Sequence, residues 1–231
     1  MRTLYRMILW DLKLQFRNNI LSVSVFIAVF YVAIFLLLGL RGKDKILIAL
    51  IFSDPTFLGF IFTGVLVLFE KSANTLQALI VTPVKIWQYL FSKAISLTII
   101  TSVICLAMVF ASHGFRFNYF YFLAAIFLSS ILFIFLGFIG VAKVKSFNQY
   151  IIVIPIFITP LILPYLNFFE ITNTLWFYIL PTQASFILFE GAFEKISLAE
   201  TFYAIGYLSF TIWITYFISK QLFIKHIVRG E

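Results

Sequence analysis

The sequence is poor in charged residues, which make up 11% of its 231 positions, whereas 63% are hydrophobic. A soluble domain normally carries charge on about a quarter of its residues, so this chain has too little charge to cover a water-exposed surface. Its mean hydropathy of +1.08 is typical of a protein that folds in lipid. The shortage of charge excludes a water-soluble enzyme and indicates an integral membrane protein.

Cysteine and histidine are also scarce. Cys105 is the only cysteine, so no intrachain disulfide can form. His113 and His226 lie far apart, and a metal site needs more ligands than they supply, so we expect none. The net charge of +8 could suggest nucleic acid, but the cations sit in loops between apolar runs, where membrane orientation places them. We therefore expect a lipid bilayer as partner and no nucleic acid.

Catalytic motifs are missing as well. The chain has no G-x-x-x-x-G-K-[ST] phosphate loop, no G-x-S-x-G and no H-E-x-x-H. We therefore expect no catalytic residues and no cofactor in this chain. The carboxylates that an ion-coupled carrier needs inside its spans are absent too, since Asp54 and Glu70 fall near predicted helix ends.

Long apolar runs are what the sequence does have. At roughly 20 apolar residues per span, they predict an all-α membrane protein with six transmembrane helices in one domain, residues 1–231. The expected spans are 20–40, 55–69, 91–110, 119–142, 150–164 and 202–223. Asp54 and Pro55 read as the start of the second span, which leaves 46–52 as an interfacial piece. Gly137 and Gly140 predict close helix packing in the fourth.

An amphipathic helix is predicted over residues 1–18, before the first span. Its cations share one stripe on a helical wheel, because steps of 4, 7 and 4 residues return to nearly the same angle. They are Arg2, Arg6, Lys13 and Arg17. We expect this helix to lie in the membrane interface with the cations toward anionic headgroups.

Prolines mark the region before the last span. Pro155, Pro160 and Pro164 fall within ten residues, which predicts an interrupted fifth helix. Pro181 separates two further short apolar pieces. We expect residues 165–190 to form short re-entrant helices at the outer leaflet, with these prolines in an outer gate.

The distribution of Lys and Arg predicts orientation. Most of them fall in the segments that share a side with the two termini, and the late loop on the other side is acidic, with Glu170, Glu190, Glu194 and Glu200. The other side keeps Arg41, Lys43, Lys45, Arg116 and Lys195, of which the first three argue against this arrangement but are outweighed by the total. The positive-inside rule therefore predicts cytosolic termini.

Residues 69–94 form the longest cytosolic connection, and their pattern predicts a helix–turn–helix. Leu76, Leu79 and Ile80 make one apolar face, and Asn74 and Gln77 lie opposite. Thr82 and Pro83 read as the start of the next helix. A helix that merely rests on headgroups is the alternative interpretation.

This stretch resembles the signature of the type 2 membrane subunits of ATP-binding-cassette (ABC) exporters. The matching features are Glu70-Lys71, Thr75-Leu76, Leu79, Pro83 and Lys93. The sequence of this stretch most resembles bacterial fluoroquinolone-export permeases. Asn74 is a departure, since the family usually has Gly there, but Asn tolerates left-handed backbone.

The resemblance implies a coupling helix that docks into a separate ABC ATPase subunit. Its contact residues would be Glu70, Asn74, Thr75, Leu76, Gln77, Leu79, Ile80 and Pro83. It also implies ATP and Mg²⁺ in the ATPase chain only, a second permease subunit, identical or different, and the bacterial plasma (inner) membrane. The expected function is the membrane half of an exporter for an amphipathic or drug-like substrate. The alternatives are an ABC-type subunit for haem and cytochrome assembly or lipid-linked export, an ion-coupled carrier, or a non-transporting scaffold.

Overall fold

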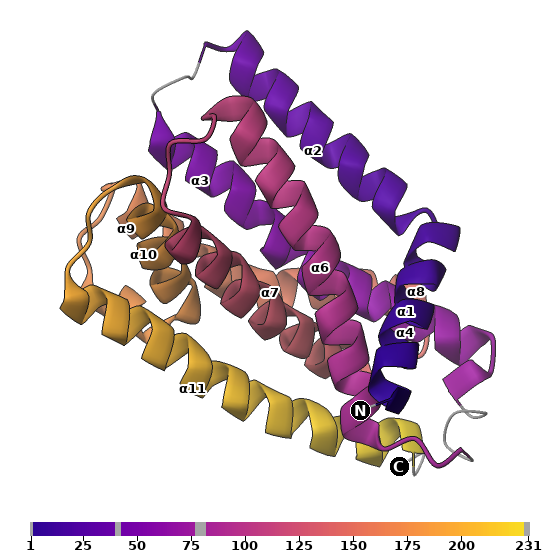
Figure 1. Ribbon diagram of the computed structural model, residues 1–231. Helices are drawn as coiled ribbons and strands as arrows, with labels where there is room; N and C mark the ends of the chain where they lie inside the picture. Colours follow the sequence, from indigo (N-terminus) through magenta and orange to yellow (C-terminus); the bar gives the residue numbers. More distant parts are fainter. Residues whose placement is uncertain (1, 40–42, 77–81, 229–231) are drawn as a thin grey trace.

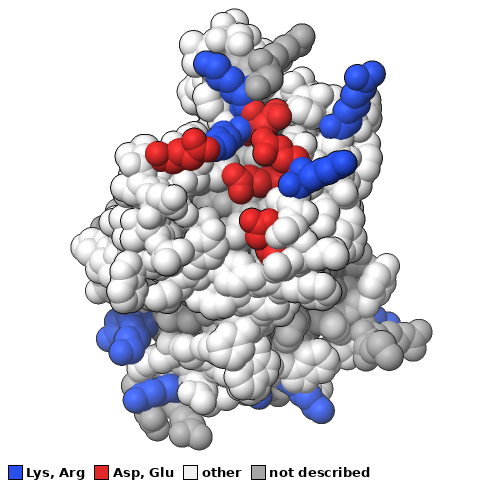
Figure 2. All heavy atoms as spheres, turned by 90° about the vertical axis from the view of Figure 1, so that its left-hand side faces the viewer, with Lys and Arg blue, Asp and Glu red and all other residues white. Residues whose placement is uncertain are grey.

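The computed structural model describes residues 2–39, 43–76 and 82–228, which fold into helices joined by short turns. Within these described residues, six helical segments are long and apolar enough to cross a membrane: Ile20–Leu37, Asp44–Ser72, Ile86–Ser112, Tyr119–Ala142, Phe147–Phe168 and Leu198–Ile227. The predicted all-α fold with six transmembrane helices is confirmed. Both chain ends lie at the same end of the bundle (Figure 1). On the face drawn in Figure 2, charged residues gather toward the two ends and leave an uncharged belt between them.

Helix α7 (Tyr119–Ala142) lies at the centre, in contact with α6 (Ile86–Ser112), α10 (Pro181–Phe193) and α11 (Leu198–Phe223). It begins where the sequence predicts, because Asn118 Oδ1 caps it by accepting from the Phe120 N–H at 3.0 Å. A Cβ on Gly137 would lie only 2.7 Å from the Phe60 carbonyl oxygen. The expected close packing at this glycine is therefore present.

Helix α1 (Arg2–Arg17) precedes the first span, α2 (Ile20–Leu37), and packs along α6. The predicted N-terminal helix is present, and its apolar residues Leu9 and Phe16 are about half exposed, as expected for a helix that meets lipid. The side that faces the bundle also carries buried polar residues. Gln15 is buried there and donates from Nε2 to Ser96 Oγ at 2.8 Å.

The second span does not begin at Pro55, as we expected. Helix α3 (Asp44–Ser53), the π-helical turn η1 (Asp54–Phe62) and α4 (Thr63–Ser72) form one continuous segment. A π turn shifts the hydrogen-bond register and so accommodates a proline, which has no N–H to donate, without ending the helix. Ile51 and Phe52 are completely buried, so the segment 46–52 is not an interfacial piece.

The third span begins earlier than predicted. Helix α6 starts at Ile86 rather than at Pro83 or Phe91. Gln88 accepts from the Lys85 N–H at 3.0 Å and so closes the first turn at Lys85. This cap by the Gln88 side chain replaces the proline start that the sequence suggested.

The fifth span is less broken than predicted. Helix α8 (Phe147–Ile162) continues through Pro155 and Pro160 and ends just before Pro164. The φ of proline is close to that of a helix, so each proline removes one hydrogen bond without ending the helix here. Short pieces follow as expected: α9 (Tyr165–Phe168), the 3₁₀ turn η2 (Leu175–Ile179) and α10, which Pro181 opens.

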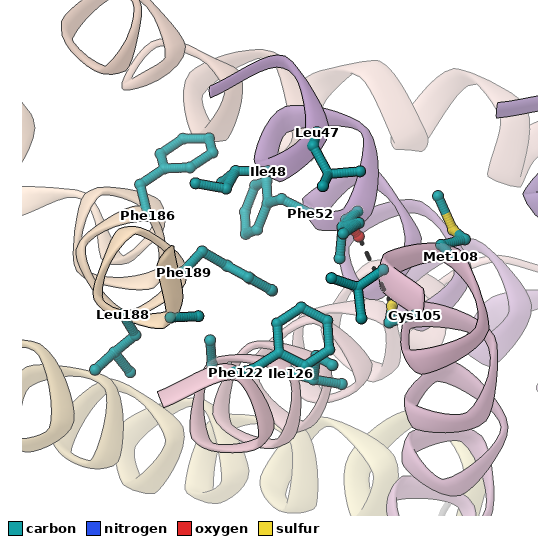
Figure 3. Packing of buried hydrophobic residues seen from close by; sticks show 14 of the residues in the cluster. Leu47, Ile48, Phe52, Cys105, Met108, Phe122, Ile126, Phe186, Leu188 and Phe189 are labelled. Atoms are coloured by element: carbon teal, nitrogen blue, oxygen red, sulfur yellow. Dashed lines mark hydrogen bonds between the residues drawn. The ribbon is translucent and has the colours of Figure 1, made fainter. Parts of the chain in front are cut away.

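Helix α10 lies at the end of the bundle away from the termini (Figure 1). Buried phenylalanines pack it against the other helices (Figure 3). Phe52 of α3 packs against Phe186 of α10, with ring centroids 4.5 Å apart, and edge-on against Phe189 at 6.0 Å. Ser185 of α10 also hydrogen-bonds Ser129 of α7 at 2.8 Å. Helix α10 is therefore part of the core. The last span, α11, begins at Leu198 and continues into the π turn η3 (Ile224–Val228).

Candidate coupling junction

Three helices meet through charged side chains at the end of the bundle that holds both termini (Figure 1). Lys93 of α6 donates from Nζ to Asp11 Oδ1 of α1 and to Glu70 Oε1 of α4, each at 2.5 Å. The Tyr89 hydroxyl donates to the other oxygen of Glu70 at 2.6 Å. We call Asp11, Glu70, Tyr89 and Lys93 the junction cluster.

The junction cluster is withdrawn from water. The side chain of Lys93 is 2% exposed, that of Asp11 7% and that of Glu70 16%. A buried ion pair gives little net stability compared with apolar packing, but removing one partner costs about 3–5 kcal/mol because it strands a buried charge. The cluster therefore fixes how α1, α4 and α6 lie relative to one another.

Lys71, at the end of α4, makes a second set of contacts between helices. Its Nζ donates to the carbonyl oxygens of Val144 at 2.9 Å, Ala142 at 3.3 Å and Val141 at 3.4 Å. The last carbonyls of a helix lack partners and carry partial negative charge, so an ammonium there is favourable. Glu70 and Lys71 thus bind the end of α4 to α6 and to α7, respectively.

A tight turn follows α4. Asn74 has φ of 55°, in the left-handed region where the resembling family has Gly, and Asn adopts it at little cost. Thr75 donates from its hydroxyl to the Glu70 carbonyl oxygen at 3.0 Å. The chain thereby turns back immediately after the two residues that tie α4 down.

Leu76 contradicts one sequence expectation. We expected it on an apolar face that a partner would cover, but it is 3% exposed and belongs to this chain's own core, in the same cluster as Leu66 and Tyr89. The turn at Asn74 folds it back against the bundle. Gln77, Leu79 and Ile80 lie outside the described residues, and Pro83 is exposed just before α6.

Comparison with known proteins assigns the chain. A model of the fluoroquinolones export permease protein family matches residues 2–231. The chain belongs to this family. Two relatives are the fluoroquinolones export permease proteins of Mycobacterium tuberculosis strains CDC 1551 / Oshkosh and ATCC 25618 / H37Rv, each 28% identical over 199 residues, which is 85% of this chain and 83% of the relative. No solved structure matches the chain. The predicted family resemblance is confirmed.

Within this fluoroquinolones export permease fold, sequence reasoning found only part of the junction. The motif indicated Glu70 and Lys93 without showing that they touch, and it missed Asp11 and Tyr89. A signal for Asp11 was present: it is an acidic residue in an otherwise cationic helix, four positions from Gln15 and hence on the same face. That face is the one that packs on α6.

The remaining predicted residues are not members of the junction cluster. Arg6, Lys13 and Arg17 are exposed on α1, and Lys13 Nζ lies 5.8 Å from the centroid of the Trp10 ring. Pro155 and Pro160 lie inside α8, whereas Pro164 and Pro181 border the short pieces that follow it.

Acidic side chains gather at the end of the bundle away from the termini (Figure 2). Asp44 pairs with His113 at 3.1 Å, and Lys45 pairs with Glu170. Glu190 of α10, outside the six candidate spans, has its pKa raised to about 7, first by burial and then by nearby carboxylates, against the opposing effect of Lys45. This end therefore differs from the basic end where the termini lie.

Proposed function

We propose that this chain is the membrane-spanning subunit of an ABC exporter. In this proposal it forms the path for an amphipathic or drug-like substrate of the fluoroquinolone class, and a separate ATPase subunit supplies the energy. The family and the six spans support a membrane transporter subunit rather than an enzyme. The two tuberculosis relatives are named as fluoroquinolone exporters, which favours that substrate class.

The junction cluster is the observation that carries the proposal. A soluble ATPase can move a membrane helix only through a segment that is rigidly joined to it. The described residues after α4 follow directly on Glu70 and Lys71, which are bound to α6 and α7. A force applied to residues 77–83 would therefore reach three spans together.

Orientation and assembly belong to the same proposal. The basic end with both termini faces the cytosol, in the plasma membrane of a bacterium, and a second permease subunit completes the path. ATP and Mg²⁺ are bound by the ATPase subunit.

Substitutions at two neighbouring leucines test the coupling segment. In the proposal Leu79 docks on the ATPase, whereas Leu76 is a core residue of this chain. Burying a leucine contributes roughly 1.5–3 kcal/mol, so Leu79→Asp should weaken co-elution with the ATPase ten-fold or more and leave the subunit folded. Leu76→Asp should instead lower the melting temperature of the isolated subunit.

The experiment uses the subunit purified with its ATPase partner, and it measures co-elution, substrate-stimulated ATP hydrolysis and thermal stability. If Leu79→Asp co-elutes and hydrolyses ATP like wild type, the segment is only an interfacial helix and the coupling assignment is wrong.

A further inference from the structure

A cavity of about 690 Å³ opens beside the junction cluster, and the coupling proposal makes no use of it. It follows α1, with α4 as the opposite wall and residues of α6 completing it. Its apolar lining includes Met7, Trp10 and Phe69, and its charged lining includes Arg6, Arg17 and the junction cluster. The cavity is therefore amphipathic along the length of the interfacial helix.

Within the junction cluster, the negative charges outnumber the positive ones. Two carboxylates, of Asp11 and Glu70, share the single ammonium of Lys93. Asp11 is 5% exposed, and its Oδ2 is buried without a hydrogen-bond partner among the residues that the structure describes. A buried carboxylate oxygen without a donor is costly, so this site favours an additional positive charge with N–H groups to donate.

Glu70 is the carboxylate that a ligand can reach, because it is the most exposed member of the two ion pairs. An ammonium held there would compensate the surplus negative charge. Arg6 and Arg17 are exposed and border the same cavity. Arg6 is five residues from Asp11, a helical rise of about 7.5 Å, so its long side chain can hold an anion next to that ammonium. The site therefore suits a headgroup that carries both signs.

The surroundings indicate where such a molecule comes from. Trp10 is 58% exposed on the rim, and tryptophan prefers the headgroup level of a bilayer. Leu9 and Phe16 of the same helix are exposed for contact with lipid. We propose that this cavity binds the headgroup of an aminophospholipid, with its ammonium at Glu70, where it compensates the charge that Asp11 adds to the cluster, and its phosphate at Arg6 or Arg17. This proposal goes beyond the transport function and does not rest on it.

Photolabelling tests the site directly. The full-length protein in detergent micelles is labelled with a photoactivatable phosphatidylethanolamine, and the labelled peptides are mapped by mass spectrometry. Unlabelled phosphatidylethanolamine, phosphatidylcholine and phosphatidylglycerol then compete. We expect labelling of α1 and α4 peptides, with phosphatidylethanolamine competing about ten-fold better than phosphatidylcholine, whose quaternary ammonium has no N–H to donate.

Variants separate the two halves of the headgroup. Asp11→Asn and Glu70→Gln each leave one carboxylate for one ammonium, so both should remove the preference for phosphatidylethanolamine over phosphatidylcholine. Arg6→Gln changes an exposed side chain, so the fold should survive; it should weaken binding of both lipids and keep the preference. Glu170→Gln, which alters the carboxylate that pairs with Lys45 and not the junction cluster, is the matched control and should bind like wild type.

Three results would overturn the proposal: equal competition by phosphatidylethanolamine and phosphatidylcholine in the wild type, strongest competition by phosphatidylglycerol, or a preference that persists in both carboxylate variants. If the carboxylate variants do not fold, the wild-type competition and Arg6→Gln still decide the question.

Discussion

Replacing Lys93 with methionine should destabilise the protein far more than the loss of one surface lysine. Lys93 is 1% exposed and is shared between Asp11 and Glu70. Methionine keeps much of the volume but removes the charge, so two carboxylates would face each other in a buried site. The substitution does not raise the free energy of the unfolded chain to the same extent, because water solvates both carboxylates there.

The expected loss is about 3–5 kcal/mol, the usual cost of breaking a buried ion pair from one side. For a chain of this length that corresponds to a fall in melting temperature on the order of 10 °C. The assay is thermal unfolding of the purified subunit in detergent, followed by size-exclusion chromatography. Lys45→Met is the matched control, because Lys45 is 40% exposed, pairs with an exposed glutamate and should contribute at most about 1 kcal/mol.

A charge-neutral rescue completes the test. The triple variant Asp11→Asn, Glu70→Gln and Lys93→Met removes all three charges, so it should recover much of the stability that Lys93→Met loses. If Lys93→Met melts within about 2 °C of wild type, or if the triple variant is less stable than the single one, the junction cluster does not hold the three helices as we argue.

The other predictions concern topology, packing and pH. An impermeant thiol reagent applied to intact cells should label Ser197→Cys but not Ser72→Cys, without background from the buried Cys105; the opposite pattern would reverse the proposed orientation. Gly137→Ala should lower the melting temperature by several degrees, because its Cβ would meet the Phe60 carbonyl oxygen at 2.7 Å, whereas Gly206→Ala, with nothing within 4 Å, should not; equal effects would contradict this packing. Because burial raises the pKa of Glu190 from 4.5 to about 7, the folded state keeps a proton that the unfolded chain releases, so stability present below pH 4.5 is lost as the pH rises toward 7. Melting temperatures measured from pH 4.5 to 8 should therefore fall less in Glu190→Gln than in wild type; parallel curves would show that Glu190 is not responsible.

The number of spans could be predicted because apolar length is a local property. The run 119–142 is bounded by Asn118 and Lys143, and α7 has these limits. Prolines were misleading signals for the helix ends, because the backbone could continue as a helix through them. Pro55 reads as a helix start, yet a π turn carries the helix through it, and Pro155 and Pro160 remain inside α8.

The junction could be predicted only in part, because its members are far apart in sequence. Asp11 and Lys93 are separated by 82 positions, and no local periodicity brings them together. The motif contained Glu70 and Lys93, so the place was indicated but the contact was not. Leu76 shows the opposite error: its pattern matches a docking face, but the turn at Asn74 places it in the core.

ATP-dependent drug uptake into everted membrane vesicles tests the central claim most directly. Vesicles from cells that express this chain with its ATPase should accumulate a fluorescent fluoroquinolone when ATP is added, and an uncoupler of the proton gradient should have no effect. Vesicles in which the ATPase carries a substituted phosphate-loop lysine, or that contain this chain alone, should not accumulate the drug. Uptake by this chain alone that an uncoupler abolishes would contradict the account and show an ion-coupled carrier instead.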